Sequence, residues 1–352
     1  MKEILIDGSM GEGGGQLLRY SAALSAITGK PIKIINIRAK RSNPGLRPQH
    51  LTAVKTIAEM VDADVEGLRV GSTALKITPK RRPKGGTYNI DIGTAGSISL
   101  LLQALLPVLA FADRPVEATI RGGTTVRWAP PIPYMQNVLL PLLAKFNLKA
   151  EIALIRRGFY PRGGGIVKVR VTPAKLKAAE FLPYSRIEEI TGVSYVGNLP
   201  KHIAIRQANS AKQYLEREGY GKYLRDIMVD YSTPAISQGT GIVLWAKTDQ
   251  GVAGGDSIGE RGKRAEIVGQ EAAEKLVRTL KAGVTVDPHA LDNLVIYMAI
   301  SEGRSRVYSA EMTSHADTAI KLCSMITGSD FMVRREDGKI VVESEGAGSN
   351  IY

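Results

Sequence analysis

Apolar residues in the first eighty positions alternate between short strand-like runs and longer stretches with helical spacing. The apolar runs predict strands over residues 4–8, 31–38, 64–71 and 72–79, and the helical spacing predicts helices over residues 16–29 and 48–61. The last two strands follow each other closely enough to form a hairpin. The pattern therefore predicts a β-α-β-α-β-β unit in which helices back a mixed sheet.

The same pattern returns twice more along the chain. A second copy extends from residue 87 to residue 173, with predicted helices over residues 98–113 and 132–146. Pro31 and Pro115 occupy matching places, which gives a period of about 84 residues. A third copy lies near the C-terminus, with predicted helices over residues 290–301 and 314–328 and closing strands over residues 330–336 and 339–346.

Residues 182–281 do not follow the repeated pattern, and their own pattern predicts a small inserted α/β domain. It has predicted strands over residues 187–197, 225–232 and 241–249, and predicted helices over residues 200–219 and 262–283. We therefore expect an α/β (α+β) fold, in which three units in residues 1–181 and 282–352 pack their helices into one large domain.

Net charge is the feature of the composition that indicates a partner, and it favours a polyanion, whereas the remaining values are ordinary for a globular protein. The chain of 352 residues has 47 Lys and Arg against 34 Asp and Glu, a net charge of +13, which favours RNA or a nucleotide. A generally basic surface is the alternative. Aromatic residues make up only 6%, so we expect recognition by Arg, Lys and backbone amides. The single Cys323 excludes a disulfide framework, and no apolar run is long enough to cross a bilayer, so we expect a cytoplasmic protein.

The segment GSMGEGGGQLLR, residues 8–19, joins a predicted strand to a predicted helix. Its glycines allow backbone N–H groups to converge on an anion at the start of the helix, although such a turn is often only structural. No Gly-Lys-Ser/Thr follows, so it is not a Walker A motif. Glu12 within it indicates a bound divalent cation, or else a carboxylate that faces solvent.

A basic loop and a histidine supply further candidate chemistry. Arg38, Lys40, Arg41 and Arg47 lie within ten residues and suit phosphate binding, with a solvated loop as the alternative. His315 follows Ser314, the expected N-cap of a helix, and an apolar face continues beyond it. A histidine at the rim of the core is one interpretation. The other is a neutral imidazole that attacks phosphorus, because a helix N-terminus disfavours imidazolium and favours phosphate.

The segments DGSMGEGGGQLLR, RPQHLTAVK, YPRGGG and SHADTA occur in an order and spacing that resembles the RNA 3'-terminal phosphate cyclase family over nearly the whole chain. The resemblance implies three repeated units plus a small inserted domain, and a large domain similar to that of enolpyruvyl transferases. It also implies ATP-dependent conversion of an RNA 3'-phosphate to a 2',3'-cyclic phosphodiester, the work of a ligase that forms a phosphoric ester bond. A histidyl-adenylate and an RNA-adenylate would be intermediates, with pyrophosphate and AMP released.

The resemblance also assigns roles to residues. His315 is the expected nucleophile, and Glu12 the ligand of a divalent metal, Mg²⁺ or Mn²⁺. The expected ATP contacts are Gly13, Gly14, Gln103, Pro130, His289 and Asp292. The expected phosphate or RNA contacts are Arg19, Arg38, Arg41 and Gln49.

Two rival functions share this architecture. A non-catalytic scaffold in ribosomal RNA processing would resemble the cyclases but lack the histidine, which is present here as His315. An enolpyruvyl transferase would form no adenylate. The expected partners are RNA 3'-phosphate ends and ATP, with no membrane, and a homo-oligomer remains open.

Overall fold

The computed structural model describes residues 2–348, which form four sheets of four strands each. The first unit contains, in order, β1 Ile4–Asp7, α1 Gly15–Thr28, β2 Ile32–Ile35, α2 Pro48–Val61, β3 Asp64–Glu66 and β4 Leu75–Thr78. Its strand order is β1-β2-β4-β3, with the first pair parallel and the other two antiparallel. The expected β-α-β-α-β-β unit with a mixed sheet is confirmed, although β3 is shorter than the strand predicted over residues 64–71.

The second unit repeats this topology. It contains β5 Gly86–Asp91, α3 Ile98–Ala110, β6 Val116–Gly122, α4 Ile132–Tyr134, α5 Leu140–Lys145, β7 Lys149–Arg156 and β8 Gly165–Thr172. A π-helical turn, Met135–Leu139, separates α4 from α5, so the helix predicted over residues 132–146 has an internal irregularity. The strand order β5-β6-β8-β7 has the same parallel and antiparallel pairs as the first sheet.

The third unit is split in the sequence. Its elements are β9 Glu180–Phe181, α8 Pro288–Ile300, β14 Glu302–Ser309, α9 Ser314–Thr327, β15 Asp330–Glu336 and β16 Lys339–Ala347. The sheet order β15-β16-β14-β9 shows that β9 takes the place of β1 and β5, parallel to the following strand. The unit is thus complete only because a two-residue strand lies before the inserted segment.

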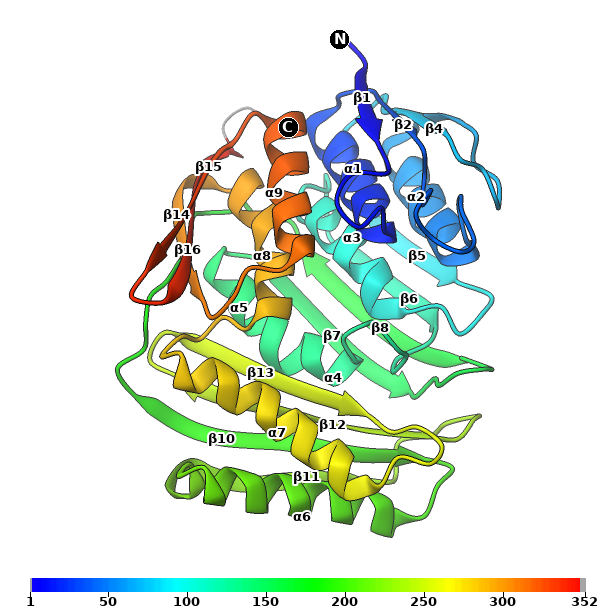
Figure 1. The fold of residues 1–352 in the computed structure, drawn as a ribbon. Helices are drawn as coiled ribbons and strands as arrows, with labels where there is room; N and C mark the ends of the chain where they lie inside the picture. The colour runs from blue at the N-terminus through cyan, green and yellow to red at the C-terminus, as the bar shows by residue number, and fades with distance from the viewer. Residues whose placement is uncertain (1, 349–352) are drawn as a thin grey trace.

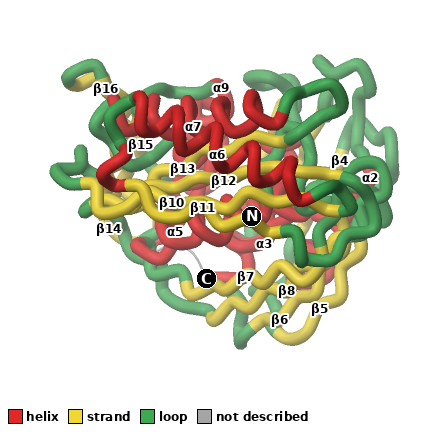
Figure 2. Tube along the Cα trace, turned by 90° about the horizontal axis from the view of Figure 1, so that it is seen from below, coloured by secondary structure: helices red, strands yellow, loops and turns green. Residues whose placement is uncertain are grey.

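The remaining elements form the fourth sheet, on residues 187–281. They are β10 Ile187–Gly197, α6 Lys201–Arg217, β11 Leu224–Asp230, β12 Gly239–Thr248, β13 Gly251–Ile258 and α7 Ala265–Lys281. The glycine-rich strand β13 was not predicted. Both helices lie against one face of the sheet (Figure 2). We keep residues 182–281 as the proposed inserted domain, which has its own apolar core between the sheet and α6 and α7.

The helices of the three units meet in the centre of the large domain. Figure 1 shows α1, α3, α8 and α9 packed between the sheets, and α1 contacts both α3 and α9. Every residue of α1 from Leu17 to Ile27 is buried, as expected for a helix with neighbours on all sides. This packing brings the N-termini of α1 and α9 to one region. Within residues 2–348, no helix combines the length and apolar character that a bilayer crossing requires.

Candidate active site at the starts of helices α1 and α9

The glycine loop runs from β1 to α1, and its glycines fit positions that a side chain would disturb. Gly11 and Gly13 have φ angles of 60° and 58°, in the left-handed region that favours glycine. A Cβ on Gly15 would lie 2.3 Å from Nε2 of His50 and 3.0 Å from Nη1 of Arg19. A Cβ on Gly14 would lie 3.2 Å from Nη2 of Arg41. The loop thus lets three cationic or polar side chains approach the backbone at the start of α1.

Arg19 is the clearest sign of an anion site. It is only 6% exposed, and its Nε has no hydrogen-bond partner within the described chain. Its Nη2 donates to Oε1 of Gln103 at 3.4 Å, which joins two residues predicted to bind phosphate and ATP. Burial lowers the pKa of the guanidinium to about 10, so Arg19 is still charged at neutral pH. A buried positive charge without a carboxylate partner is costly, and a bound phosphate would neutralise it.

His50 was not among the predicted site residues, but it lies beside Arg19. Its Nδ1 accepts a hydrogen bond from the Arg47 amide at 3.2 Å, which leaves Nε2 as the protonated nitrogen of a neutral ring. Burial, followed by the charges of Arg19, Arg38 and Arg47, lowers the pKa of His50 to about 3. His50 therefore adds a neutral donor to the site. The only sequence signal was its place next to Gln49 at the start of α2.

The basic loop folds over the glycine loop. Arg41 Nη2 lies 3.3 Å from Oε2 of Glu12, and Lys40 Nζ donates to the Gly11 carbonyl at 2.9 Å. Arg38 has a positive φ of 55° and donates from Nη1 to the carbonyls of Asn43 and Gly45. The loop is thereby held next to the start of α1, close to Glu12 and Gly14.

Gln49 is held by the second unit. Its Oε1 accepts a hydrogen bond from the Ser97 amide at 3.3 Å, in the turn that precedes α3. A Cβ on Gly96 in the same turn would lie 3.1 Å from Cβ of Gln49. The first and second units thus contribute to one region that also contains Arg19 and Gln103.

His315 projects into this region from the third unit. Its Nε2 lies 3.7 Å from Oε2 of Glu12, and its side chain is 44% exposed. The neighbouring Ser314 hydroxyl donates to Oε1 of Glu12, so two residues of α9 contact the glycine loop. The apolar residues along the same helix, Ala319, Leu322 and Cys323, are buried, but the imidazole is not enclosed among them.

The start of α9 differs by one residue from the expectation. Thr313, rather than Ser314, is the N-cap, because its Oγ1 accepts from the Ala316 amide at 2.9 Å. The Ser314 hydroxyl is occupied by Glu12 instead. His315 is therefore the second residue of the helix. Burial lowers the pKa of its imidazole below the ordinary 6.5; Glu12 opposes this effect, and Arg19 and Arg41 add to it.

Asp292 reaches the same helix start from α8. It is buried, and the Thr313 hydroxyl donates to its Oδ1. Burial raises the pKa of the Asp292 carboxyl to about 7, against the effect of that hydrogen bond. His289 is exposed in the first turn of α8, and it is close enough for its charge to lower the pKa values of both Asp292 and His315. Pro130 is half-buried at the end of the loop after β6, and its contact with adenosine stays a prediction.

The carboxylate of Glu12 suits a divalent cation that is bound mainly by phosphates. In residues 2–348, no three His, Cys, Asp or Glu side chains are grouped to hold a metal by themselves. Mg²⁺ and Mn²⁺ need no such cage, because one or two carboxylates, substrate phosphates and water commonly complete their shells. The hydrogen bond from Ser314 lowers the pKa of Glu12, so the carboxylate is ionised.

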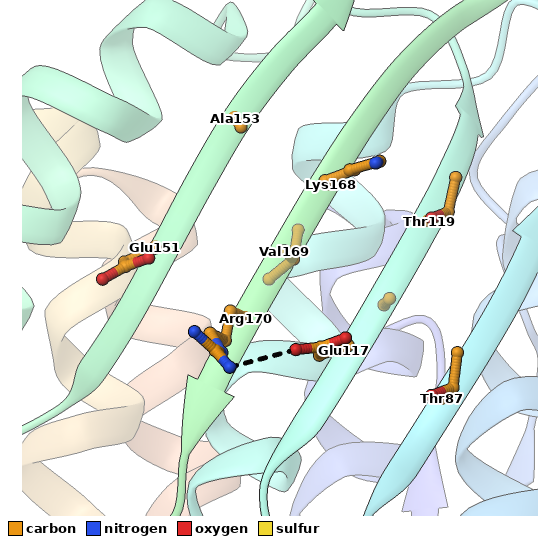
Figure 3. A pocket seen from close by; sticks show the side chains of 9 residues that line it. Thr87, Glu117, Thr119, Glu151, Ala153, Lys168, Val169 and Arg170 are labelled. Atoms are coloured by element: carbon orange, nitrogen blue, oxygen red, sulfur yellow. Dashed lines mark ion pairs between the residues drawn. The ribbon is translucent and has the colours of Figure 1, made fainter.

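A separate hollow lies on the outer face of the second sheet. Figure 3 shows its side chains on β5 to β8, including Glu117 and Arg170, whose charged atoms are 3.2 Å apart. None of the predicted site residues lines it. It therefore does not belong to the candidate site.

Comparison with known proteins fits this geometry. Residues 10–333 match the family model described as RNA 3'-terminal phosphate cyclase. The chain belongs to the RNA 3'-terminal phosphate cyclase family. Relatives that carry this family name come from Pyrobaculum aerophilum, 49% identical over 99% of both chains, and Pyrobaculum neutrophilum, 50% identical over 98% of this chain and 99% of the relative. A third, from Archaeoglobus fulgidus, is 44% identical over 97% of this chain and the whole relative.

Among solved structures, the enolpyruvyl transferase NikO from Streptomyces tendae superposes with a TM-score of 0.40 and 8% identity. The superposition covers 100% of this chain and 50% of that chain. Likeness at this level does not bear on the reaction. Membership of the cyclase family rests on the sequence match instead.

Proposed function

We propose that this protein converts RNA 3'-terminal phosphates to 2',3'-cyclic phosphodiesters in an ATP-dependent reaction that proceeds through adenylated His315. The observation that carries the proposal is the half-exposed imidazole of His315, whose Nε2 lies 3.7 Å from Oε2 of Glu12. Glu12 belongs to the loop that leads into Gly15, where Arg19 and His50 approach the backbone. A nucleophile, a carboxylate for a metal and a buried guanidinium whose Nε has no partner in the described chain lie together at the starts of two helices. Helix N-termini favour phosphate groups.

In the first step, the Nε2 lone pair of neutral His315 attacks the α-phosphorus of ATP. The bond from that phosphorus to its bridging oxygen breaks, and pyrophosphate leaves with the electron pair. A low pKa favours this step, because a protonated imidazole has no lone pair to donate. Burial and the neighbouring arginines lower the pKa of His315 in this way.

In the second step, an oxygen of the RNA 3'-phosphate attacks the adenylate phosphorus and frees His315. In the third step, the 2'-OH attacks the activated 3'-phosphorus and gives up its proton to solvent, the bond to AMP breaks, AMP leaves with the electron pair, and the ring closes. The 2'-OH and the phosphorus belong to the same ribose, so this ring closure profits from a high effective molarity. AMP and the cyclic end are the products.

The remaining predicted residues bind and orient the substrates. Arg19, Arg38, Arg41 and Gln49 would hold the RNA phosphate or the ATP phosphates, and Gly13 and Gly14 would let the phosphates approach the backbone. Gln103, Pro130, His289 and Asp292 would surround adenosine. Glu12 would hold Mg²⁺ or Mn²⁺, which supplies neutralisation of phosphate charge when bound. We also propose a cytoplasmic setting and leave a homo-oligomer open.

Incubation with ATP labelled at the α-phosphate tests the nucleophile. We expect wild-type protein to retain acid-labile label after denaturation, and His315→Ala to retain none. His202→Ala is the matched control, because His202 is an exposed histidine on α6 of the proposed inserted domain. A wild-type protein that neither retains label nor cyclises RNA would support the non-catalytic scaffold instead. Label on His315→Ala would place the nucleophile elsewhere.

A further inference from the structure

Three loops next to the candidate site expose aromatic side chains to solvent. Trp128, in the loop after β6, is 91% exposed, and Tyr160, in the loop after β7, is 78% exposed. Tyr231, in the loop after β11, is 56% exposed. Large aromatic side chains at such exposure contribute little to folding, and exposed aromatic groups gathered in one region are typical of binding surfaces.

The three loops are joined by hydrogen bonds. The amide of Thr124 donates to the carbonyl of Gly158 at 2.8 Å, which connects the first loop to the second. The amide of Arg157 donates to the carbonyl of Pro234 at 2.7 Å, and the Ser237 hydroxyl donates to the carbonyl of Phe159 at 3.1 Å. These bonds connect the second loop to the third. The three exposed aromatic residues are therefore carried by loops that are joined to one another into one surface.

This surface continues toward the phosphate-binding residues. A Cβ on Gly163, in the second loop, would lie 2.8 Å from the Thr94 carbonyl oxygen. The amide of Gly123, in the first loop, donates to the Gly96 carbonyl at 2.8 Å. The turn 94–97 thus lies against both loops and also holds Gln49 through Ser97. A chain whose end is bound near Gln49 can extend over the three loops.

The charge of the loops selects the class of partner. Residues 122–131 and 156–165 contain Arg127, Arg156, Arg157 and Arg162 and no acidic residue, and residues 231–238 contain no acidic residue either. Lys201 Nζ lies 4.2 Å from the centre of the Tyr231 ring. Two acids approach from outside these loops: Glu260 pairs with Arg127, and Asp230 pairs with the buried Arg157, which leaves Arg156 and Arg162 without an acid partner among the described residues. Aromatic faces among cations match the bases and phosphates of single-stranded nucleic acid.

The backbone of Trp128 supports a role beyond the fold. Its φ of 59° lies in the left-handed region, which is unfavourable for a bulky side chain. The side chain is almost fully exposed and gains little packing there in return. Strained residues of this kind gather at functional sites.

We propose that the surface formed by Trp128, Tyr160 and Tyr231 binds the nucleotides that precede the 3'-phosphate of single-stranded RNA, by stacking of bases on the aromatic rings. The inference rests on the proposed function for the position of the 3' end. It also revises the expectation that Arg, Lys and backbone amides alone recognise RNA. The low aromatic content of the whole chain does not prevent a local concentration in three neighbouring loops.

Tryptophan fluorescence tests the surface directly, because the chain contains only Trp128 and Trp245. In a Trp245→Phe variant the emission reports Trp128 alone. We expect a 3'-phosphorylated RNA decamer to quench this emission on binding, since stacking brings a base into contact with the indole. A decamer that binds without quenching, or that binds Trp128→Ala as tightly as wild type, would overturn the proposal and leave the surface to a protein partner.

Cyclisation kinetics separate this surface from the active site. We expect Trp128→Ala to raise KM for the decamer about tenfold, while KM for a 3'-phosphorylated dinucleotide and labelling of His315 by ATP stay unchanged. Trp128→Phe should restore the decamer KM, because it keeps a stacking face. Met332→Ala is the matched control, on the exposed edge strand β15, which Figure 1 shows far from α4 at the end of the first loop.

The two proposals fail in different ways. If wild-type protein retains no label from ATP but the decamer still quenches Trp128, the proposed chemistry is wrong and the surface stands. A second outcome is that His315 of the wild type is labelled, but Trp128→Ala lowers this labelling by the same factor by which it raises KM for the decamer. Trp128 would then belong to the nucleotide site, and the proposed RNA surface would be wrong.

Discussion

His315 and His50 show how the same side chain acquires different properties a short distance apart. His315 is half-exposed and faces the Glu12 carboxylate, whereas His50 is buried among Arg19, Arg38 and Arg47. Burial disfavours imidazolium at both positions, but only His50 has cationic neighbours without a nearby carboxylate to offset them. The pKa of both rings is lowered, and that of His50 falls to about 3.

A proton NMR titration of the histidine ring signals tests these environments. We expect His315 to titrate below 6.5 and His50 to remain neutral down to about pH 3, because its charged form is disfavoured most. His315→Ala and His50→Asn assign the two signals. Since a lowered pKa keeps the ring neutral down to lower pH, the rate of labelling by ATP should be flat near pH 7 and fall only in acid.

The Glu12→Gln variant checks the sign of this prediction. The Glu12 charge raises the pKa of His315, so its removal should move the midpoint of the His315 titration further down. A wild-type midpoint above 6.5 would mean that Glu12 outweighs burial. The ring would then be largely protonated in weak acid, and its assignment as a nucleophile would lose its electrostatic basis.

At the scale of elements, Gly15 at the start of α1 has a role that helix propensity does not predict. Replacement of Gly by Ala ordinarily stabilises a helix by up to about 1 kcal/mol. Here a Cβ would lie 2.3 Å from His50 Nε2 and 3.0 Å from Arg19 Nη1, so both groups would have to move. We expect Gly15→Ala to keep the fold but weaken ATP binding about tenfold, as for the loss of one charge-assisted hydrogen bond.

Isothermal titration calorimetry with ATP measures this effect, and thermal unfolding reports the fold. The double variant Gly15→Ala/His50→Ala removes the ring that the new Cβ would meet. It should bind ATP more tightly than Gly15→Ala/Thr52→Ala, in which the neighbouring half-buried Thr52 is truncated and the clash remains. Equal affinity of wild type and Gly15→Ala would show that the phosphates do not lie at this end of α1.

Most elements could be predicted because their local pattern agrees with their final environment. The helices α1, α2, α3, α8 and α9 contain long stretches rich in apolar residues, the strands of the closing hairpins are short apolar runs, and Gly29 and Gly328 end α1 and α9. Strand β13 was missed because glycines occupy much of it and weaken the strand signal, although it is central to the packing against α7. Strand β9 was missed because two residues form no pattern, and only pairing with β14 defines them.

The candidate site could be predicted as a set of residues but not as an arrangement. The glycine and basic loops and His315 were selected from sequence, and tertiary packing of α1 against α9 brings them together. His50 was missed because its role depends on burial beside Arg19, which comes from another helix. The cap of α9 was misplaced by one residue because Ser314 is bound by Glu12, 302 positions away.

At the scale of the whole molecule, the ion pair between Arg157 and Asp230 joins the large domain to the proposed inserted domain. Arg157 follows β7 and Asp230 ends β11, and their charged atoms are 2.5 Å apart. The guanidinium lies 3.9 Å from the centre of the Tyr195 ring, on β10. Although burial alone would raise the pKa of Asp230, hydrogen bonds from Thr233 and Arg157 hold it well below the ordinary value.

Loss of one partner of this pair should therefore destabilise the whole protein. We expect Arg157→Met to lower the free energy of unfolding by about 3 kcal/mol, because it leaves the largely buried Asp230 carboxylate without its counter-charge. Arg157→Met/Asp230→Asn should recover part of this loss, since the unpaired charge is then removed. Urea unfolding measures both, and calorimetry should show the proposed inserted domain unfolding ahead of the large domain in the single variant.

Arg170→Met is the matched control for this prediction, because Arg170 pairs with Glu117 on the exposed face of the second sheet (Figure 3). Exposed pairs contribute about 0–1 kcal/mol, so this variant should unfold almost as wild type. A loss in Arg157→Met no larger than in Arg170→Met would mean that the two domains are joined mainly by apolar contacts. The loops around Trp128 and Tyr160 would then keep their relation to Tyr231 without the ion pair, and RNA binding by Arg157→Met should be unchanged.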